Sequence, residues 1–166
     1  MLRAMEDIVF ESVRTVTPDE FARLVDERAR TGDLHAYELL NGRIVMTPPA
    51  GYPHGAIELE VGAFLLHFVK ERGVGLAFGP SQGFTLPSGD TVGPDAAFIS
   101  NERWTAGPLP AEGEFIRIVP DLVVEILSPS TASRDRGEKR GIYERNGVRE
   151  YWLVDARAHT VTVTIR

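Results

Sequence analysis

The chain has 166 residues, of which 43% are hydrophobic and none is cysteine, and its formal net charge is −6. These values predict one globular domain over residues 1–166, and they exclude a disulfide framework and a thiolate metal site. The N-terminus holds no apolar run of signal-peptide or membrane-spanning length, so we expect a cytoplasmic protein with no membrane partner.

The first predicted elements are a helix and a β-hairpin. Thr17 is followed by a proline and two acidic residues, which is a typical helix start, and the helix should end near Gly32. Two short apolar runs then flank Asn41 and Gly42, a pair that favours a tight hairpin turn. Glu38 should lie on the first arm of this hairpin.

A long amphipathic helix and three strands are predicted next. Apolar residues recur every three or four positions from 53 to 73, which indicates a helix closed by glycine. A strand over 74–78 follows, and then a hairpin whose arms are 84–86 and 91–99. The proline- and glycine-rich stretch 104–114 is typical of a surface loop.

The last part of the chain predicts a strand, a helix and two further strands. Residues 122–127 are apolar on both faces apart from Glu125, as in a central strand of a covered sheet. A helix over 133–146 contains two glycines, each of which costs about 1 kcal/mol relative to alanine and indicates close packing or a nearby ligand. Strands over 149–155 and 161–165 complete the order.

Two carboxylates occupy segments that otherwise predict buried strands. Asp95 lies on the returning arm of the second hairpin, and Glu125 lies inside the central strand. An ionised carboxylate among apolar side chains is strongly unfavourable unless a cation or hydrogen bonds compensate it. Two such groups indicate a shared positive ligand, which we interpret as a divalent metal ion, and they favour a metal-dependent nuclease.

Three stretches, 37–55, 93–99 and 120–155, resemble a known family. They are similar to the Uma2 family of the PD-(D/E)XK nuclease superfamily, and the resemblance extends over roughly residues 15–166. It implies an α/β (α+β) fold with a restriction-endonuclease-like core, in which helices flank a mixed central β-sheet and an N-terminal helix and β-hairpin are added. It also implies an endonuclease that uses Mg²⁺ or Mn²⁺ to hydrolyse the phosphodiester bonds of DNA.

The resemblance implies that Asp95, Glu125 and Lys139 are catalytic, with Asp95 and Glu125 as the metal ligands. The superfamily pattern places a lysine two residues after the acid, but that position is Leu127 in this chain. The Uma2 pattern has an aspartate and a lysine four residues apart after the strand, which points to Lys139 as the replacement. Lys139 would orient the attacking water or stabilise the transition state.

Glu38, His54 and Asp135 are secondary candidates for the site, and Glu38 ranks first among them. Simpler roles remain open for several of these residues. His54 can cap the start of a helix, Asp95 can stabilise a turn beside a proline, and Asp135 can pair with Lys139 on one helix face.

Positive charge is concentrated between residues 134 and 149, where six cations and three anions give a local net charge of +3. Arg136 and Arg140 are the predicted nucleic-acid-binding residues, because cationic side chains supply most of the affinity for a phosphate backbone. A solvated helix face explains the same charges equally well. The resemblance further implies a homodimer, since nucleases of this type commonly pair to cut two strands.

Two other functions are compatible with parts of the sequence. One is a nuclease-like module that has lost turnover and binds nucleic acid or a protein partner, which the missing strand lysine and the net charge of −6 both allow. The other is a serine hydrolase, because residues 79–83 match the G-x-S-x-G pattern. That pattern needs a strand, a sharp turn and a helix, whereas Pro80 precedes Ser81 and a predicted strand follows it.

Overall fold

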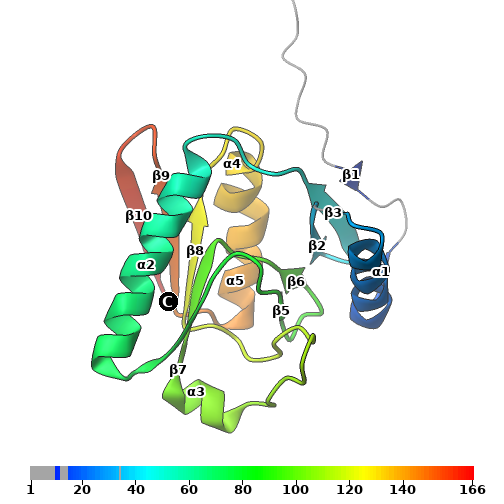
Figure 1. Ribbon diagram of the computed structural model, residues 1–166, viewed down its shortest axis with the longest axis horizontal. Coiled ribbons are helices and arrows are strands. Elements are labelled where there is room, and N and C mark those ends of the chain that lie inside the picture. The colour runs from blue at the N-terminus through cyan, green and yellow to red at the C-terminus, as the bar shows by residue number, and fades with distance from the viewer. Residues whose placement is uncertain (1–9, 12–14, 34) are drawn as a thin grey trace, which may run out of the picture.

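The computed structural model describes residues 10–11, 15–33 and 35–166, and Figure 1 shows their arrangement. The helices are α1 (Pro18–Arg30), α2 (His54–Arg72), α3 (Asn101–Ala106), α4 (Ala132–Arg134), the π-helical segment η1 (Asp135–Lys139) and α5 (Arg140–Asn146). The strands are β1 (Phe10–Glu11), β2 (Ala36–Leu40), β3 (Arg43–Thr47), β4 (Gly75–Phe78), β5 (Phe84–Thr85), β6 (Thr91–Val92), β7 (Ala96–Ser100), β8 (Leu122–Ile126), β9 (Glu150–Asp155) and β10 (Thr160–Ile165).

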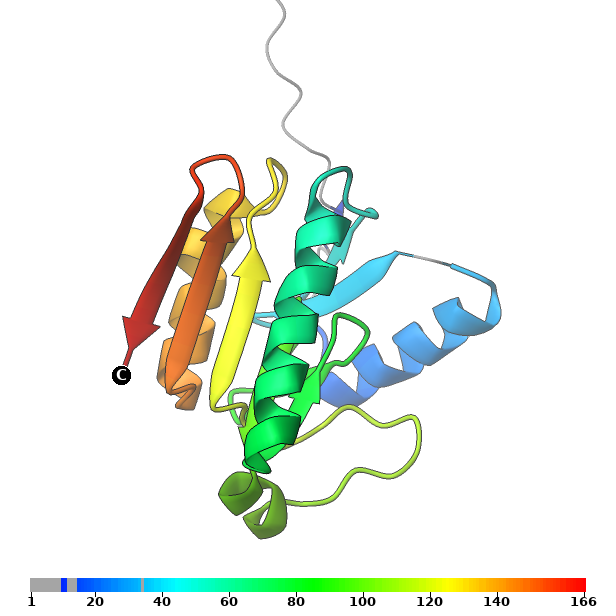
Figure 2. The same ribbon diagram turned by 60° about the vertical axis from the view of Figure 1, so that its left-hand side comes forward.

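The described strands form two five-stranded sheets. One is a mixed sheet in the order β10-β9-β8-β7-β4, in which β8 and β9 are parallel and the other neighbours are antiparallel. Figure 2 shows α2 on one face of this sheet and α5 on the other. The predicted restriction-endonuclease-like core, a mixed sheet flanked by helices with an N-terminal helix and hairpin, is therefore confirmed.

Local sequence signals explain the first helix and the first hairpin. The Thr17 side chain accepts a hydrogen bond from the backbone N–H of Glu20, and the Glu20 side chain accepts one from Thr17 in return, which is a capping box. Asn41 and Gly42 both have positive φ, 51° and 76°, so β2 and β3 are joined by the tight turn that this pair favours. The predicted helix at 53–73 is α2, which ends at Gly73 in the left-handed conformation.

The second predicted hairpin is only half correct. β5 pairs with β6 as expected, but the returning arm leaves that sheet after Val92 and continues as β7 in the mixed sheet. The break falls at Gly93 and Pro94, because proline has no N–H to donate to a strand ladder. Asp95 consequently stands just before β7 instead of inside a strand.

Two helical segments also differ from the prediction. The expected loop at 104–114 begins with the last turn of α3, whose N-cap Ser100 accepts a hydrogen bond from the Arg103 N–H, a cap that the sequence pattern did not reveal. The expected helix at 133–146 is present but is interrupted by the π-helical segment η1, which contains Gly137. A π-helical turn frequently marks a functional site.

Apolar side chains cover both faces of the mixed sheet. On the α5 face, Val123 and Tyr151 belong to a cluster with Ile142 and Tyr143. On the α2 face, Val124 belongs to a second cluster that includes side chains of α2 and β9. Glu125 lies two residues after Val123 on β8, so its side chain points to the same α5 face. Its carboxylate therefore enters the protein interior. Among the described residues, no helix is both long enough and apolar enough to span a membrane.

Candidate active site

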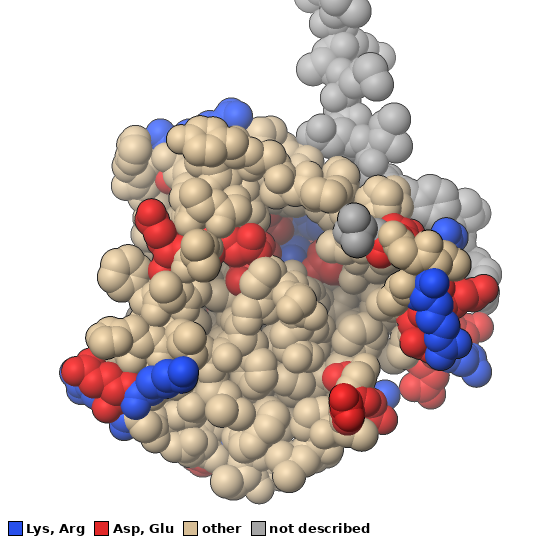
Figure 3. Space-filling model, viewed as in Figure 1, with Lys and Arg blue, Asp and Glu red and all other residues tan. Residues whose placement is uncertain are grey.

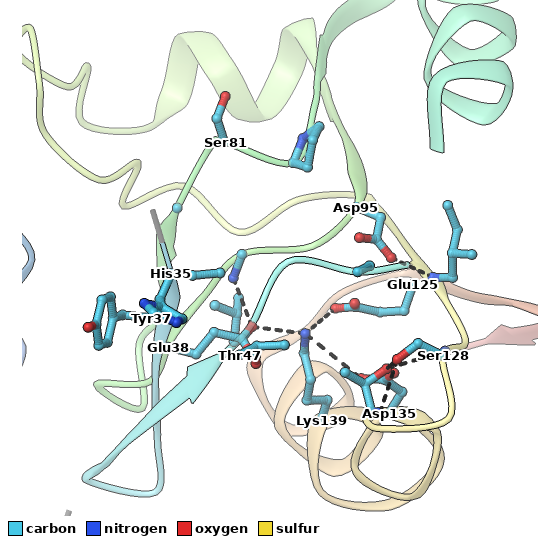
Figure 4. A pocket seen from close by; sticks show the side chains of 18 of the residues that line it. His35, Tyr37, Glu38, Thr47, Ser81, Asp95, Glu125, Ser128, Asp135 and Lys139 are labelled. Carbon is cyan, nitrogen blue, oxygen red and sulfur yellow. Dashed lines mark hydrogen bonds and ion pairs between the residues drawn. The ribbon is translucent and has the colours of Figure 1, made fainter. Parts of the chain in front are cut away.

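Asp95, directly before β7, and Glu125, on the neighbouring strand β8, line the same cavity. Ala96 is paired with Val124 in an antiparallel register, which places Asp95 opposite Glu125 at the next step of the ladder. The Asp95 Oδ2 atom accepts a hydrogen bond of 2.6 Å from the backbone N–H of Ile126, the residue after Glu125. The two carboxylates that the sequence singled out therefore lie side by side at the end of β8 (Figure 4).

The ammonium group of Lys139 lies at the centre of the site. Its Nζ atom is 2.6 Å from Glu125 Oε1, 2.9 Å from Glu38 Oε1 and 4.0 Å from Asp135 Oδ1, as the dashed lines in Figure 4 indicate. Each of these four residues is at most 7% exposed. Within the part of the chain that the structure describes, Lys139 is the one cation within ion-pair distance of these three carboxylates.

Neighbouring groups hold these side chains in place. The Tyr143 hydroxyl of α5 donates a 2.7 Å hydrogen bond to Glu125 Oε1, and the backbone N–H of Gly93 donates one of 3.0 Å to Glu38 Oε1. The Tyr151 hydroxyl of β9 donates to the backbone carbonyl of Asp135, which anchors η1 to the sheet. Groups from α5, from β9 and from the link between β6 and β7 thus hold the acids and η1 in place.

The electrostatics of the cluster reflect its excess of negative charge. Burial raises the pKa of Glu125 well above its ordinary value, against the attraction of Lys139, and the nearby carboxylates of Asp135 and Asp95 add to the rise. Burial likewise raises the pKa of Asp135. Burial alone would lower the pKa of Lys139, but the attraction of Glu125 and Glu38 outweighs it and raises that pKa. Lys139 is therefore protonated at neutral pH.

His54 and Glu58 lie one turn apart on α2. They approach the site from the face of the mixed sheet that α2 covers (Figure 2). The His54 Nε2 atom is 3.5 Å from Asp95 Oδ2, and this contact raises the pKa of His54 although burial acts against it. Burial and the charge of Asp95 raise the pKa of Glu58. Both side chains line the same cavity as Asp95 and Glu125.

A cavity of about 490 Å³ contains the whole cluster and lies between the mixed sheet and the β2–β3 hairpin. Figure 3 shows acidic and basic atoms inside this hollow, surrounded by a mostly uncharged surface. The structure brings together all the catalytic and secondary candidates from the sequence, namely Asp95, Glu125, Lys139, Glu38, His54 and Asp135. Their catalytic roles stay predictions.

Arg136 and Arg140 lie outside the cavity, on the exposed face of the helical segment. Arg136 forms an ion pair of 2.9 Å with Asp155, and Arg140 forms one of 2.8 Å with Glu144. These contacts match a solvated helix face, and a role for the two arginines in nucleic-acid binding stays a prediction.

Several cavity-lining residues were not predicted as site residues. They are Arg134 and the hydroxyl-bearing residues Ser128, Ser130 and Thr131, which were expected only to shape the turn after β8. The Ser128 Oγ atom is 2.9 Å from Ser130 Oγ and 3.0 Å from Thr131 Oγ1, so these hydroxyls do shape the turn. Ser81 also lines the cavity, but strand β5 follows it instead of the helix that a nucleophile elbow requires.

The donor set suits a hard divalent cation. Carboxylate oxygens are the ligands that Mg²⁺ prefers, and one or two carboxylates with several waters are sufficient for it. Over the described ranges, no group of three or more histidine, cysteine, aspartate or glutamate side chains is already spaced to hold a metal ion. Lys139 engages Oε1 of both Glu38 and Glu125, whereas Asp95 has no lysine or arginine partner among the described residues. Asp95 and the adjacent Glu125 are therefore the pair that would fit the two-carboxylate case.

Comparisons with known proteins agree with this geometry. Residues 18–166 match the Uma2 family, described as "Putative restriction endonuclease". A crystal structure described as "a putative nuclease belonging to DUF820 from Anabaena variabilis" is similar with a TM-score of 0.72 and 26% sequence identity, over 90% of this chain and 79% of that chain. No curated protein matches the chain. The fold, the match over residues 18–166 and this structural neighbour support a nuclease function, and the chain belongs to the Uma2 family.

Proposed function

We propose that this protein is a Mg²⁺- or Mn²⁺-dependent endonuclease that hydrolyses phosphodiester bonds of DNA. The observation that supports the proposal is the charge balance of the cavity, where three buried carboxylates share one ammonium group. A purely structural cluster gains nothing from this excess of buried negative charge. A site that receives a divalent cation does gain from it.

Asp95 and Glu125 would hold the ion, because they lie together at the edge of the cavity and Asp95 is the more accessible of the two. A bound divalent ion would neutralise charge that develops on the phosphate and lower the pKa of a coordinated water. Glu38 and Asp135 would then retain Lys139 within the site after Glu125 turns toward the ion.

Lys139 acts in this mechanism as a cation and a hydrogen-bond donor. Its raised pKa keeps the ammonium protonated, so it does not remove a proton from the attacking water. It orients that water or stabilises the negative charge of the transition state. His54, whose raised pKa favours its protonated form, is placed beside Asp95 to donate a hydrogen bond to a substrate oxygen.

Cleavage of supercoiled plasmid DNA tests the proposal. We expect nicked product with Mg²⁺ or Mn²⁺, formed where supercoiling unpairs the strands, no product with EDTA, and at least a hundredfold loss of rate in Glu125→Gln, since the acid would bind the ion. Glu102→Gln, which removes an exposed acid of α3, is the matched control and should retain full activity. Cleavage that persists in EDTA and in Glu125→Gln would reject the assigned site.

The alternative is a nuclease-like module that binds nucleic acid or a protein without cleaving it. Leu127 occupies the superfamily's lysine position, and the ammonium that replaces it is engaged by Glu125 and Glu38. Under this alternative, DNA would be bound but stay intact with every divalent metal. The plasmid assay therefore separates the two functions.

We also propose that the protein is a homodimer that pairs through α2. This helix exposes large apolar side chains, including Leu59 (74%) and Phe64 (76%), and exposed apolar patches often mark protein–protein interfaces. Two of its three acids, Glu58 and Glu60, lie in the first half, whereas its last turn holds Lys70 and Arg72 beside the single acid Glu71. A two-fold axis would place the acidic half of one helix against the basic end of the other.

The oligomeric state of a charge variant tests this interface. We expect a dimer in sedimentation at micromolar concentration for the natural chain and a monomer for Phe64→Glu. Leu109→Glu, which alters a similarly exposed apolar residue in the loop after α3, should leave the dimer intact. A monomeric natural chain would contradict the proposal.

A further inference from the structure

Arg134 is an unpaired cation at a cavity that is otherwise strongly acidic. Among the described residues that line the cavity, the other cation of lysine or arginine type is Lys139, which is enclosed by carboxylates. Arg134 is half-buried, and it has neither a hydrogen-bond acceptor nor an ion-pair partner within the described parts of the chain. A substrate phosphate that enters this cavity would therefore find one available guanidinium group.

The residues around Arg134 also suit an anion. Ser128, Ser130 and Thr131 precede it on the turn after β8 and line the same cavity. Their hydroxyls bond to one another, and each can rotate to donate to a phosphate oxygen. Arg134 directly precedes Asp135 of the acidic cluster in the chain. A phosphate bound by Arg134 would therefore lie close to the proposed cleavage point.

The depth of the site limits the form of the nucleic acid. Glu125 and Lys139 are only 4% and 3% exposed, and they lie inside a cavity of about 490 Å³, which is a size suited to a small ligand. A nucleotide of an unpaired strand can enter such a space, whereas the phosphates of an intact duplex stay on the outside of a wide helix. The partly buried side chains of Tyr37 and Phe115 also line the cavity, although the Phe115 ring is stacked on Phe21 and both side chains pack against the core cluster around Val16 and Phe21.

The surface outside the cavity gives little support to duplex binding. The predicted contacts Arg136 and Arg140 are engaged by Asp155 and Glu144, and the chain as a whole carries a net charge of −6. Affinity for duplex DNA comes largely from cationic side chains that contact phosphates. Recognition must therefore depend more on the cavity than on the surrounding surface.

We propose that the site takes an unpaired nucleic-acid strand, with Arg134 binding the phosphate next to the cleaved bond. This inference rests on the proposed nuclease function and names the form of its substrate. It predicts that a single-stranded region, a flap or a frayed end is preferred to a fully paired duplex. Arg134 would act by binding the substrate and not by supporting the fold.

Fluorescence anisotropy with the full chain tests the inference without turnover. The probes are a labelled single-stranded DNA of about 12 nucleotides and its paired duplex, each in EDTA and in Ca²⁺. The variants are Arg134→Gln and Arg134→Lys. The matched control is Arg157→Gln, because Arg157 is an exposed arginine in the turn between β9 and β10, outside the cavity.

We expect the natural chain and Arg157→Gln to bind the single strand more tightly than the duplex. Arg134→Gln should weaken single-strand binding about tenfold or more, and reduce the slope of log affinity against log salt by about 0.7. Arg134→Lys should restore part of the affinity because it keeps the charge. Equal thermal melting temperatures for the variants would show that the fold is unchanged.

Two results would overturn the inference: unchanged single-strand affinity in Arg134→Gln, or a duplex bound as tightly as the single strand. Failure of the proposed function gives a different result. A chain that binds the single strand through Arg134 but cleaves no DNA with Mg²⁺ or Mn²⁺ would reject the hydrolytic function and support the binding site.

Discussion

Asp121 and Glu125 stand near the two ends of β8, and both are buried, with 6% and 4% of their surfaces exposed. Their surroundings are opposite in charge. Asp121 Oδ1 lies 3.0 Å from nitrogens of both Arg103 and Arg149, and its Oδ2 accepts a hydrogen bond from the Ser100 N–H. Glu125, in contrast, shares one ammonium with two further carboxylates.

The difference separates a structural acid from a functional one. The charge of Asp121 is more than compensated by its two guanidinium partners, although neither is aligned for a hydrogen bond to Oδ1. Burial raises the pKa of the Glu125 carboxyl against the attraction of Lys139, and the neighbouring carboxylates of the cluster add to the rise. Functional sites often retain such unfavourable arrangements at the expense of stability. Substitutions at the two ends of β8 should therefore have opposite effects.

The largest expected effect is that of Lys139→Met. Removal of the ammonium leaves Glu38, Glu125 and Asp135 without their cation, and loss of one partner from a buried ionic group costs about 3–5 kcal/mol. Urea unfolding without metal should show this decrease in the free energy of unfolding. Mg²⁺ should restore part of it, and an unchanged unfolding midpoint would contradict the described cluster.

Asp121→Asn should destabilise the protein by about 1–3 kcal/mol, because two guanidinium groups lose their carboxylate. The effect is smaller than for Lys139→Met, since Arg149 is about half exposed and water can solvate it. The same urea experiment measures it. Cleavage by the folded variant should match that of the natural chain, and a loss of cleavage would assign this end of β8 to the site.

Glu125→Gln should leave the metal-free protein as stable as the natural chain or more stable at neutral pH. The raised pKa means that the folded state holds the Glu125 proton more tightly than the unfolded state does. This contribution to stability is therefore present below the unfolded pKa of about 4.5 and is lost as pH rises through the folded pKa. The stability of Glu125→Gln relative to the natural chain should increase with pH from about 4.5 upward. A decrease would contradict the account.

The smallest effect is expected for Arg136→Gln, within about 0.5 kcal/mol of the natural stability. The ion pair between Arg136 and Asp155 is about half exposed on the arginine side, and exposed pairs contribute little. A larger loss in urea unfolding would show that this arginine anchors η1 to β9.

Features set by adjacent residues were predictable from the sequence. The capping box at Thr17, the turn at Asn41 and Gly42, and the burial of Glu125 all follow from neighbouring residue types. The convergence of Asp95 and Glu125 also followed, because consecutive predicted strands usually pair.

Features set by contacts distant in sequence were not predictable in the same way. The transfer of the chain from β6 to the other sheet depends on where Pro94 interrupts the ladder, and the position of Lys139 depends on a π-helical turn that has no simple sequence pattern. Arg134 was overlooked because its distinguishing property is the lack of a partner. That property appears only when the surrounding acids and cations have been placed.

The most direct test of the central claim is the stabilisation of the protein by Mn²⁺ in calorimetric thermal unfolding. The natural chain and Asp121→Asn should both gain stability, by about 2.7 kcal/mol when the free ion is at a hundred times its dissociation constant. Asp95→Asn and Glu125→Gln should lose most of this gain, because they would lack one of the two proposed metal ligands. An equal gain in all four proteins, or no gain in the natural chain, would contradict a metal site at the end of β8.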